Sequence, residues 1–220
     1  MTGYLIYHPP RTITKFDSFT VYHDDISGNQ DPYIWNKKFL HTYCHITQMS
    51  PQVGNIIFWV SGDTFPKFSY LYCDLVFVVA EKLYWENPNH ISFDDNIVDS
   101  HEAYIDHYSW SSQHYFKRRR RYTLKADPDK SFQPQDAKDN LVDILPFLIE
   151  QQLTLEQVRQ GLRAGFNSKP FSLKDNSQSL YSWLDKYATQ KIYGFQLYNL
   201  RKNNPTYFSS SKRSTNKTSC

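Results

Sequence analysis

Residues 106–121 of this 220-residue chain combine cations, aromatic side chains and histidines in one short segment. Lys and Arg side chains bind phosphate groups, and neighbouring aromatic rings offer flat faces on which an unstacked base can lie. These residue types predict a surface that binds a polynucleotide or a nucleotide. The predicted phosphate contacts are Lys117, Arg118, Arg119, Arg120 and Arg121, and the predicted stacking residues are Trp110, Tyr115 and Phe116.

The charge of this segment stands out against that of the whole chain. Residues 117–121, called the cationic run below, carry a charge of +5, whereas the net charge of the chain is +3. Without the run the protein would be mildly acidic. The alternative is an ordinary strand whose charged side chains are solvated or form salt bridges.

Two histidines and a carboxylate in the same segment could do acid–base chemistry. Asp106, His107 and His114 have the groups needed for a general base and its orienting partner. They support an alternative function, an enzyme that acts on nucleotides or nucleic acid, such as a phosphodiesterase or a base- or ADP-ribose-transferring enzyme. The competing interpretation is that these side chains only line the rim of the basic surface, because no nucleophile–base spacing is recognisable.

Two glutamines provide a possible means of recognising a base. Gln133 and Gln135 lie in the polar stretch Ser131–Gln135, which we expect to be a loop. A Gln carboxamide can form two hydrogen bonds with one base edge. Alternatively, both side chains close a turn before a helix that begins near residue 136.

A metal site is not predicted, although some suitable ligands are present. His41, Cys44 and His45 form a compact group, but a second regularly spaced pair of ligands is missing and Cys73 lies in an apolar stretch. We therefore expect no metal and no cofactor.

Hydrophobic periodicity predicts strands in the first part of the chain and helices after it. A short helix over residues 36–48 would place His41 and His45 on one face. Thr154 and Gln157 have the spacing of a capping box at the start of a helix. The predicted strands are Tyr4–Tyr7, Phe19–Tyr22, Asn55–Val60, Tyr70–Val79 and 120–126, and the other predicted helices contain Leu141–Leu148 and Ser179–Lys191.

This order of elements predicts an α+β fold. We expect a β-rich body over residues 1–135, a helical extension packed on it over 136–202, and a disordered basic tail over 203–220. No glycine-rich phosphate-binding motif of the Rossmann or P-loop type is present.

Composition narrows the possible cellular locations of the protein but says little about its function. Three cysteines form no obvious disulfide framework, the N-terminus lacks a signal-peptide pattern, and the longest apolar stretch, residues 75–80, is too short to cross a bilayer. We expect a cytoplasmic protein without a membrane partner. Tyr, Phe and Trp make up 37 of 220 residues, which suits both sheet faces and stacking surfaces.

Two stretches resemble a known class of small domains. Val53–Gly62, which contains a glycine-preceded apolar strand, and Cys73–Val79, followed by Trp85, resemble PUA-like domains of the EVE and ASCH groups. They are especially similar to the nucleotide-modification-associated domains of bacteria and phages, although Asn55 replaces the usual acidic residue. The resemblance covers residues 40–125. It implies a β-pseudobarrel whose mouth receives a nucleotide or modified base, and it implies no particular reaction.

The sequence therefore predicts a PUA-like pseudobarrel with a C-terminal helical extension. The expected function is binding of nucleic acid or a modified nucleotide in a prokaryotic DNA or RNA modification or defence system. Besides the enzyme alternative, the cationic run could instead bind an acidic protein partner.

The ligand spacing also generates a test of the metal hypothesis. Because Cys44 and His45 lack a second pair, purified protein should contain less than one zinc per chain and keep its melting temperature in a chelator. Elemental analysis and thermal unfolding measure both quantities. One zinc per chain would contradict the prediction.

Overall fold

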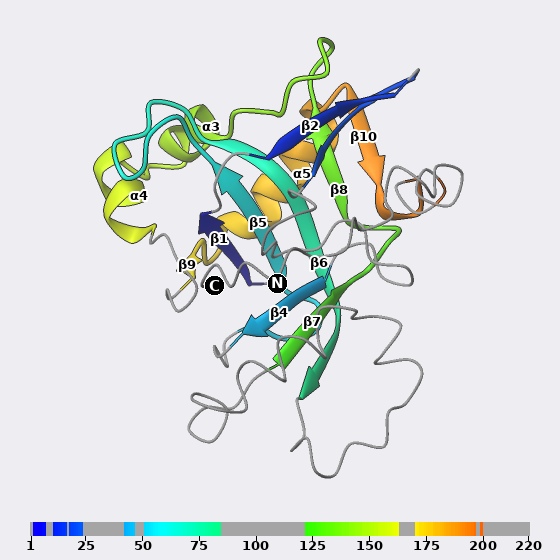
Figure 1. The fold of residues 1–220 in the computed structure, drawn as a ribbon. Coiled ribbons are helices and arrows are strands. Elements are labelled where there is room, and N and C mark those ends of the chain that lie inside the picture. Colours follow the sequence, from blue (N-terminus) through cyan, green and yellow to red (C-terminus); the bar gives the residue numbers. More distant parts are fainter. Residues whose placement is uncertain are drawn as a thin grey trace, which may run out of the picture.

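The described part of the molecule is built on a mixed eight-stranded sheet on which helices pack, so the α+β prediction is confirmed (Figure 1). The structure is a computed structural model, and it describes residues 2–7, 11–16, 18–23, 42–46, 51–84, 122–162, 170–196 and 199. Within these residues the sheet ends at strands β10 and β9 and does not close into a barrel.

The sheet has one main path and a branch. The path runs β10 (Gln190–Tyr193), β8 (Phe132–Gln135), β6 (Tyr72–Tyr84), β5 (Ile56–Ser61), β1 (Gly3–Tyr7) and β9 (Phe171–Ser172). The branch is β7 (Tyr122–Ala126), which pairs with the C-terminal half of β6 and with β4 (Thr42–Ile46). Strands β1 and β5 are parallel, and the other pairs are antiparallel. Strands β2 (Thr12–Lys15) and β3 (Thr20–His23) form a separate hairpin.

The central strands β5 and β6 are apolar on both faces, which is why the sheet has two buried sides. Alternate residues point to opposite faces of a strand. On β5, Ile56, Phe58 and Val60 join one core cluster, while Ile57 and Trp59 join the other. Helices α3 (Leu145–Glu150), α4 (Leu155–Gly161) and α5 (Asn176–Tyr187) contribute their buried apolar residues to the first cluster.

Helix α4 begins where the capping signal predicts, whereas α3 and α5 differ from their predicted bounds. Thr154 accepts a hydrogen bond from the Gln157 amide, and the Gln157 side chain accepts one from the Thr154 amide, which confirms the capping box. Leu141 and Asp143 form isolated β-bridges, so α3 begins only at Leu145. Helix α5 ends at Tyr187 because the following residues form β10.

Two predicted elements are wrong. The helix expected over residues 36–48 is, in its described part, strand β4, because pairing with β7 satisfies the backbone of Thr42–Ile46. The loop expected at Ser131–Gln135 is mostly strand β8, which lies between β10 and β6. In addition, β9 and β10 come from the segment predicted to be helical, and they form the two ends of the main sheet path.

Candidate functional site

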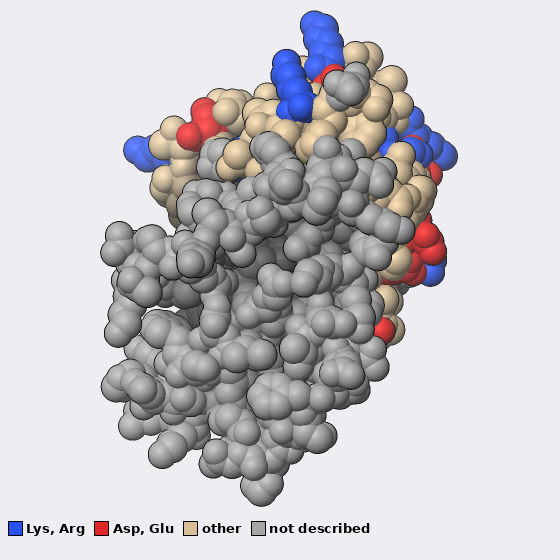
Figure 2. All heavy atoms as spheres, turned by 45° about the vertical axis from the view of Figure 1, so that its right-hand side comes forward, with Lys and Arg blue, Asp and Glu red and all other residues tan. Residues whose placement is uncertain are grey.

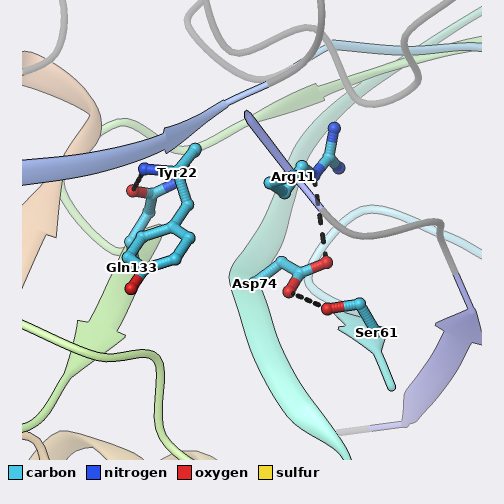
Figure 3. A network of polar contacts seen from close by, with 5 residues as sticks. All are labelled: Arg11, Tyr22, Ser61, Asp74 and Gln133. Carbon is cyan, nitrogen blue, oxygen red and sulfur yellow. Dashed lines mark hydrogen bonds and ion pairs between the residues drawn. The ribbon is translucent and has the colours of Figure 1, made fainter. Parts of the chain in front are cut away.

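A buried polar cluster of Arg11, Ser61 and Asp74 lies against the central strands (Figure 3). Its position follows from an irregularity in the β5–β6 ladder. Trp59 is paired with Leu75 and the next residue, Val60, with Cys73, so Asp74 is an extra residue without a direct partner. A β-bulge of this kind redirects a side chain locally. Here it brings the Asp74 carboxylate to Ser61 and Arg11.

Asp74 makes one short contact, with Ser61, and one long contact, with Arg11. Ser61 Oγ donates a hydrogen bond of 2.6 Å to Asp74 Oδ1. Arg11 Nε lies 3.8 Å from Asp74 Oδ2, which is an ion pair beyond hydrogen-bond length. The side chains of both charged residues are fully buried. The cluster therefore joins the segment before β2 to the centre of the sheet.

Burial dominates the acid–base properties of Asp74. Removal from water raises the pKa of its carboxyl group to about 7, although the Arg11 guanidinium and the Ser61 hydroxyl both act to lower that pKa. Burial and the Asp74 carboxylate also raise the pKa of the Cys73 thiol well above its usual range. Asp74 is 0% exposed. It can gain or lose a proton near neutral pH, but in this arrangement it is shielded from a solvent-borne substrate.

Gln133 and Gln135 attach the β2–β3 hairpin to the sheet. The Gln133 carboxamide accepts a hydrogen bond of 3.1 Å from the Tyr22 amide and donates one to the Tyr22 carbonyl oxygen (Figure 3). Gln135 Nε2 donates a hydrogen bond of 2.7 Å to the Thr20 carbonyl oxygen. Both glutamines are fully buried. The N–H donors of both side chains are therefore engaged by a strand, and neither glutamine is exposed to a base edge, so they are not part of the proposed interface.

The other predicted site residues lie outside the described residues. They are Asp106, His107, Trp110, His114, Tyr115, Phe116, Lys117, Arg118, Arg119, Arg120 and Arg121. The structure does show where their segment joins the sheet. Tyr122 is paired with both Tyr84, the last residue of β6, and Ile46, the last residue of β4. Residues 85–121 therefore connect two paired strand ends.

Among the described residues, no three His, Cys, Asp or Glu side chains gather into a group that could hold a metal ion. Cys73 is a free, buried cysteine on β6. Cys44 and His45 belong to β4, and His41 lies outside the described part of the chain.

Sequence reasoning missed the Arg11–Ser61–Asp74 cluster. One signal was available, because Asp74 interrupts the apolar run that forms β6, and a lone carboxylate in a buried strand requires a partner. Nothing in the sequence connects it with Arg11.

No known family model, curated protein or solved structure matches this chain. Within the described residues, no helix has both the length and the apolar character required to span a membrane.

The glutamine contacts generate a stability prediction. Gln133→Leu keeps the side-chain size but leaves the Tyr22 amide and carbonyl groups without their partner, so we expect a loss of about 2 to 4 kcal/mol in unfolding free energy. Urea unfolding measures the loss, and hydrogen exchange at the Tyr22 amide should accelerate. Gln160→Leu is the matched control, because Gln160 is exposed and bonds only Glu156. Equal stability of the two variants would contradict the prediction.

Asp74 generates a pH prediction. The pKa of its carboxyl group is about 7 in the folded protein, against an unperturbed value of 3.8. Between these two pH values, the folded protein holds a proton that the unfolded chain releases. The contribution of Asp74 to the unfolding free energy is therefore greatest below pH 4. It falls by about 1.4 kcal/mol per pH unit until pH 7.

Asp74→Asn removes this titration. The unfolding free energy of the wild type minus that of the variant should therefore fall by on the order of 4 kcal/mol between pH 4 and pH 7.5. Urea unfolding across this range provides the measurement. Parallel pH profiles for the two proteins would show that Asp74 does not titrate in this way.

Proposed function

We propose that the protein binds nucleic acid or a nucleotide through the cationic run at residues 117–121. The observation that carries the proposal is the distribution of charge. The described residues contain 11 Lys and Arg against 12 Asp and Glu, whereas the whole chain contains 25 against 22. The excess of positive charge therefore belongs to the remaining segments, in which the run is the densest concentration of cations.

The described surface is consistent with a positive excess that belongs to the remaining segments. On the face shown in Figure 2, blue and red side chains are interspersed on the described part of the molecule. Several of its lysines are neutralised locally, as in the ion pairs of Lys130 with Asp127 at 2.9 Å and Lys191 with Asp185 at 2.7 Å. Such mixed surfaces attract phosphate weakly, because carboxylates among the cations repel it.

The position of the run along the chain also supports the proposal. Arg121 directly precedes β7, whose first residue lies opposite the last residues of β4 and β6. The segment that contains the run thus connects the end of β6 with the start of β7, at the bottom of Figure 1. Long connections held by a rigid scaffold commonly carry function.

In the proposed complex, the cationic run binds phosphates and Trp110, Tyr115 or Phe116 stacks on bases. The α+β architecture and its largely antiparallel sheet are compatible with membership of the PUA-like class, and that affiliation is part of the proposal. A role in DNA or RNA modification or defence follows from the same resemblance.

The salt dependence of binding tests the proposal. Each neutralised phosphate contributes about −0.9 to the slope of log affinity against log salt concentration on duplex, and about −0.7 on single strands. Replacing Arg118, Arg119 and Arg120 by Ala should therefore make the slope less steep by about 2 to 3. Fluorescence anisotropy with a short labelled duplex and its separated strands measures the slope.

The control variant carries Ala at Lys67, Lys138 and Lys186, three exposed lysines on the described surface. It loses the same charge and should keep the wild-type slope. If the variant of the cationic run also keeps the wild-type slope, or if the wild type binds neither nucleic acid, the proposal is wrong.

A further inference from the structure

A cleft of about 570 Å³ opens between α4 and the segment that contains β9 and the start of α5. Its volume falls in the range of roughly 300 to 1,000 Å³ that is typical of small-molecule sites. It shares no residue with the Arg11–Ser61–Asp74 cluster or with the cationic run. Its lining residues include Leu153, Gln160, Phe171, Ser172, Leu173 and Lys174.

Part of the cleft wall is apolar. Leu173 is buried and Leu153 is half-buried. Phe171 is also half-buried, and its ring packs on the backbone of Gly161, where an added Cβ would lie 2.1 Å from ring atom Cδ2. The ring is therefore held in position by α4 while part of it stays accessible. A fixed aromatic ring beside the half-buried Leu153 forms a surface suited to a flat heterocycle.

At the strand edge beside this wall, one donor and one acceptor have no partner in the described strands. The Leu173 amide donates to the Gly3 carbonyl oxygen at 2.9 Å, and Tyr4 is paired with Ser172. In an antiparallel ladder this pattern makes Tyr4 and Ser172 a non-hydrogen-bonded pair, so the N–H and C=O groups of Ser172 point away from β1. No other described strand pairs with this side of β9.

The molecule itself shows what such an edge can bind. The outward N–H and C=O groups of Tyr22 on β3 are both bonded by the planar carboxamide of Gln133. A nucleobase edge likewise places a donor beside an acceptor in one plane. An added peptide strand would need several outward residues, whereas the two-residue strand β9 offers only Ser172. The edge therefore suits a base better than a peptide.

Polar groups surround the apolar wall. Gln160 uses its Nε2 on Glu156, which leaves its carbonyl oxygen available, and the Asn176 carboxamide also lines the cleft. Lys174 is exposed and supplies a cation for phosphate, while Asp175 beside it can accept hydrogen bonds from sugar hydroxyls. Base, sugar and phosphate each have a complementary group.

We propose that this cleft binds a single nucleoside monophosphate, with the base on Phe171 and its edge on the Ser172 backbone. The phosphate binds Lys174. The choice of a nucleotide as the ligand rests on the proposed function. The cleft and the cationic run are nevertheless separate sites.

Calorimetric titration with each of the four ribonucleoside 5′-monophosphates tests the site, with the matching nucleosides and inorganic phosphate as partial ligands. Gln160→Trp places an indole in the cleft and should weaken monophosphate binding by more than about tenfold. Lys174→Asn should weaken monophosphate binding by about fivefold and leave nucleoside binding unchanged. Asn suits this position because residue 174 has a φ of 49°.

Lys138→Asn, an exposed lysine outside the cleft, is the control and should bind as the wild type does. The triple Arg→Ala variant of the cationic run should also keep wild-type monophosphate affinity, while the cleft variants keep the wild-type salt slope on polynucleotide. A failure of one site is thus distinguishable from a failure of the other.

A measurement on the wild type does not depend on the folding of any variant. Adding the monophosphate that binds should shift the Ser172 amide resonance in a ¹H–¹⁵N spectrum, because that amide gains a hydrogen bond. Absence of binding by all four monophosphates, full binding by a folded Gln160→Trp protein, or an unshifted Ser172 resonance would each overturn the inference.

Discussion

The length of strand β6 is the constraint on which the rest of the described structure depends. Its 13 residues pair with β5 and β8 near the start and with β7 toward the end, so one strand belongs to both the main path and the branch of the sheet. A strand of this length needs local adjustments, and the ladders show register shifts beside Val60 and between Val79 and Glu81. The first shift creates the buried Asp74 site. The end of β6 then determines where residues 85–121 join the sheet.

The outward backbone groups of strands β3 and β9 have different surroundings, and this difference bears on the proposed binding chemistry. On β3, glutamine side chains occupy the outward amide and carbonyl groups of Tyr22 and the carbonyl oxygen of Thr20, which prevents that edge from pairing with another strand. On β9, the corresponding groups of Ser172, a residue that lines the cleft, pair with no other described strand. The same donor–acceptor pair is therefore structural at one place and available for a ligand at the other.

Local patterns predicted the elements whose structure depends on neighbours in sequence. The apolar run of β5 and the Thr154–Gln157 capping box are confirmed, since short-range periodicity and capping determine them. Strands β4 and β8 were predicted wrongly because pairing partners far along the chain stabilise them. Strands β9 and β10 were also missed. They are two and four residues long, too short for periodicity to reveal, and they exist because β1 and β8 offer open edges.

The sequence by itself determined the α+β class and the chemical character of the cationic run, because composition and local charge do not depend on folding. It also contained a sign of the buried site, a single Asp in the apolar strand β6. Only the tertiary structure decided that Arg11 faces Asp74 and that Gln133 bonds to Tyr22, contacts that join residues 63 and 111 positions apart. Such contacts depend on strand order and register, which bring distant segments together and which no local pattern encodes.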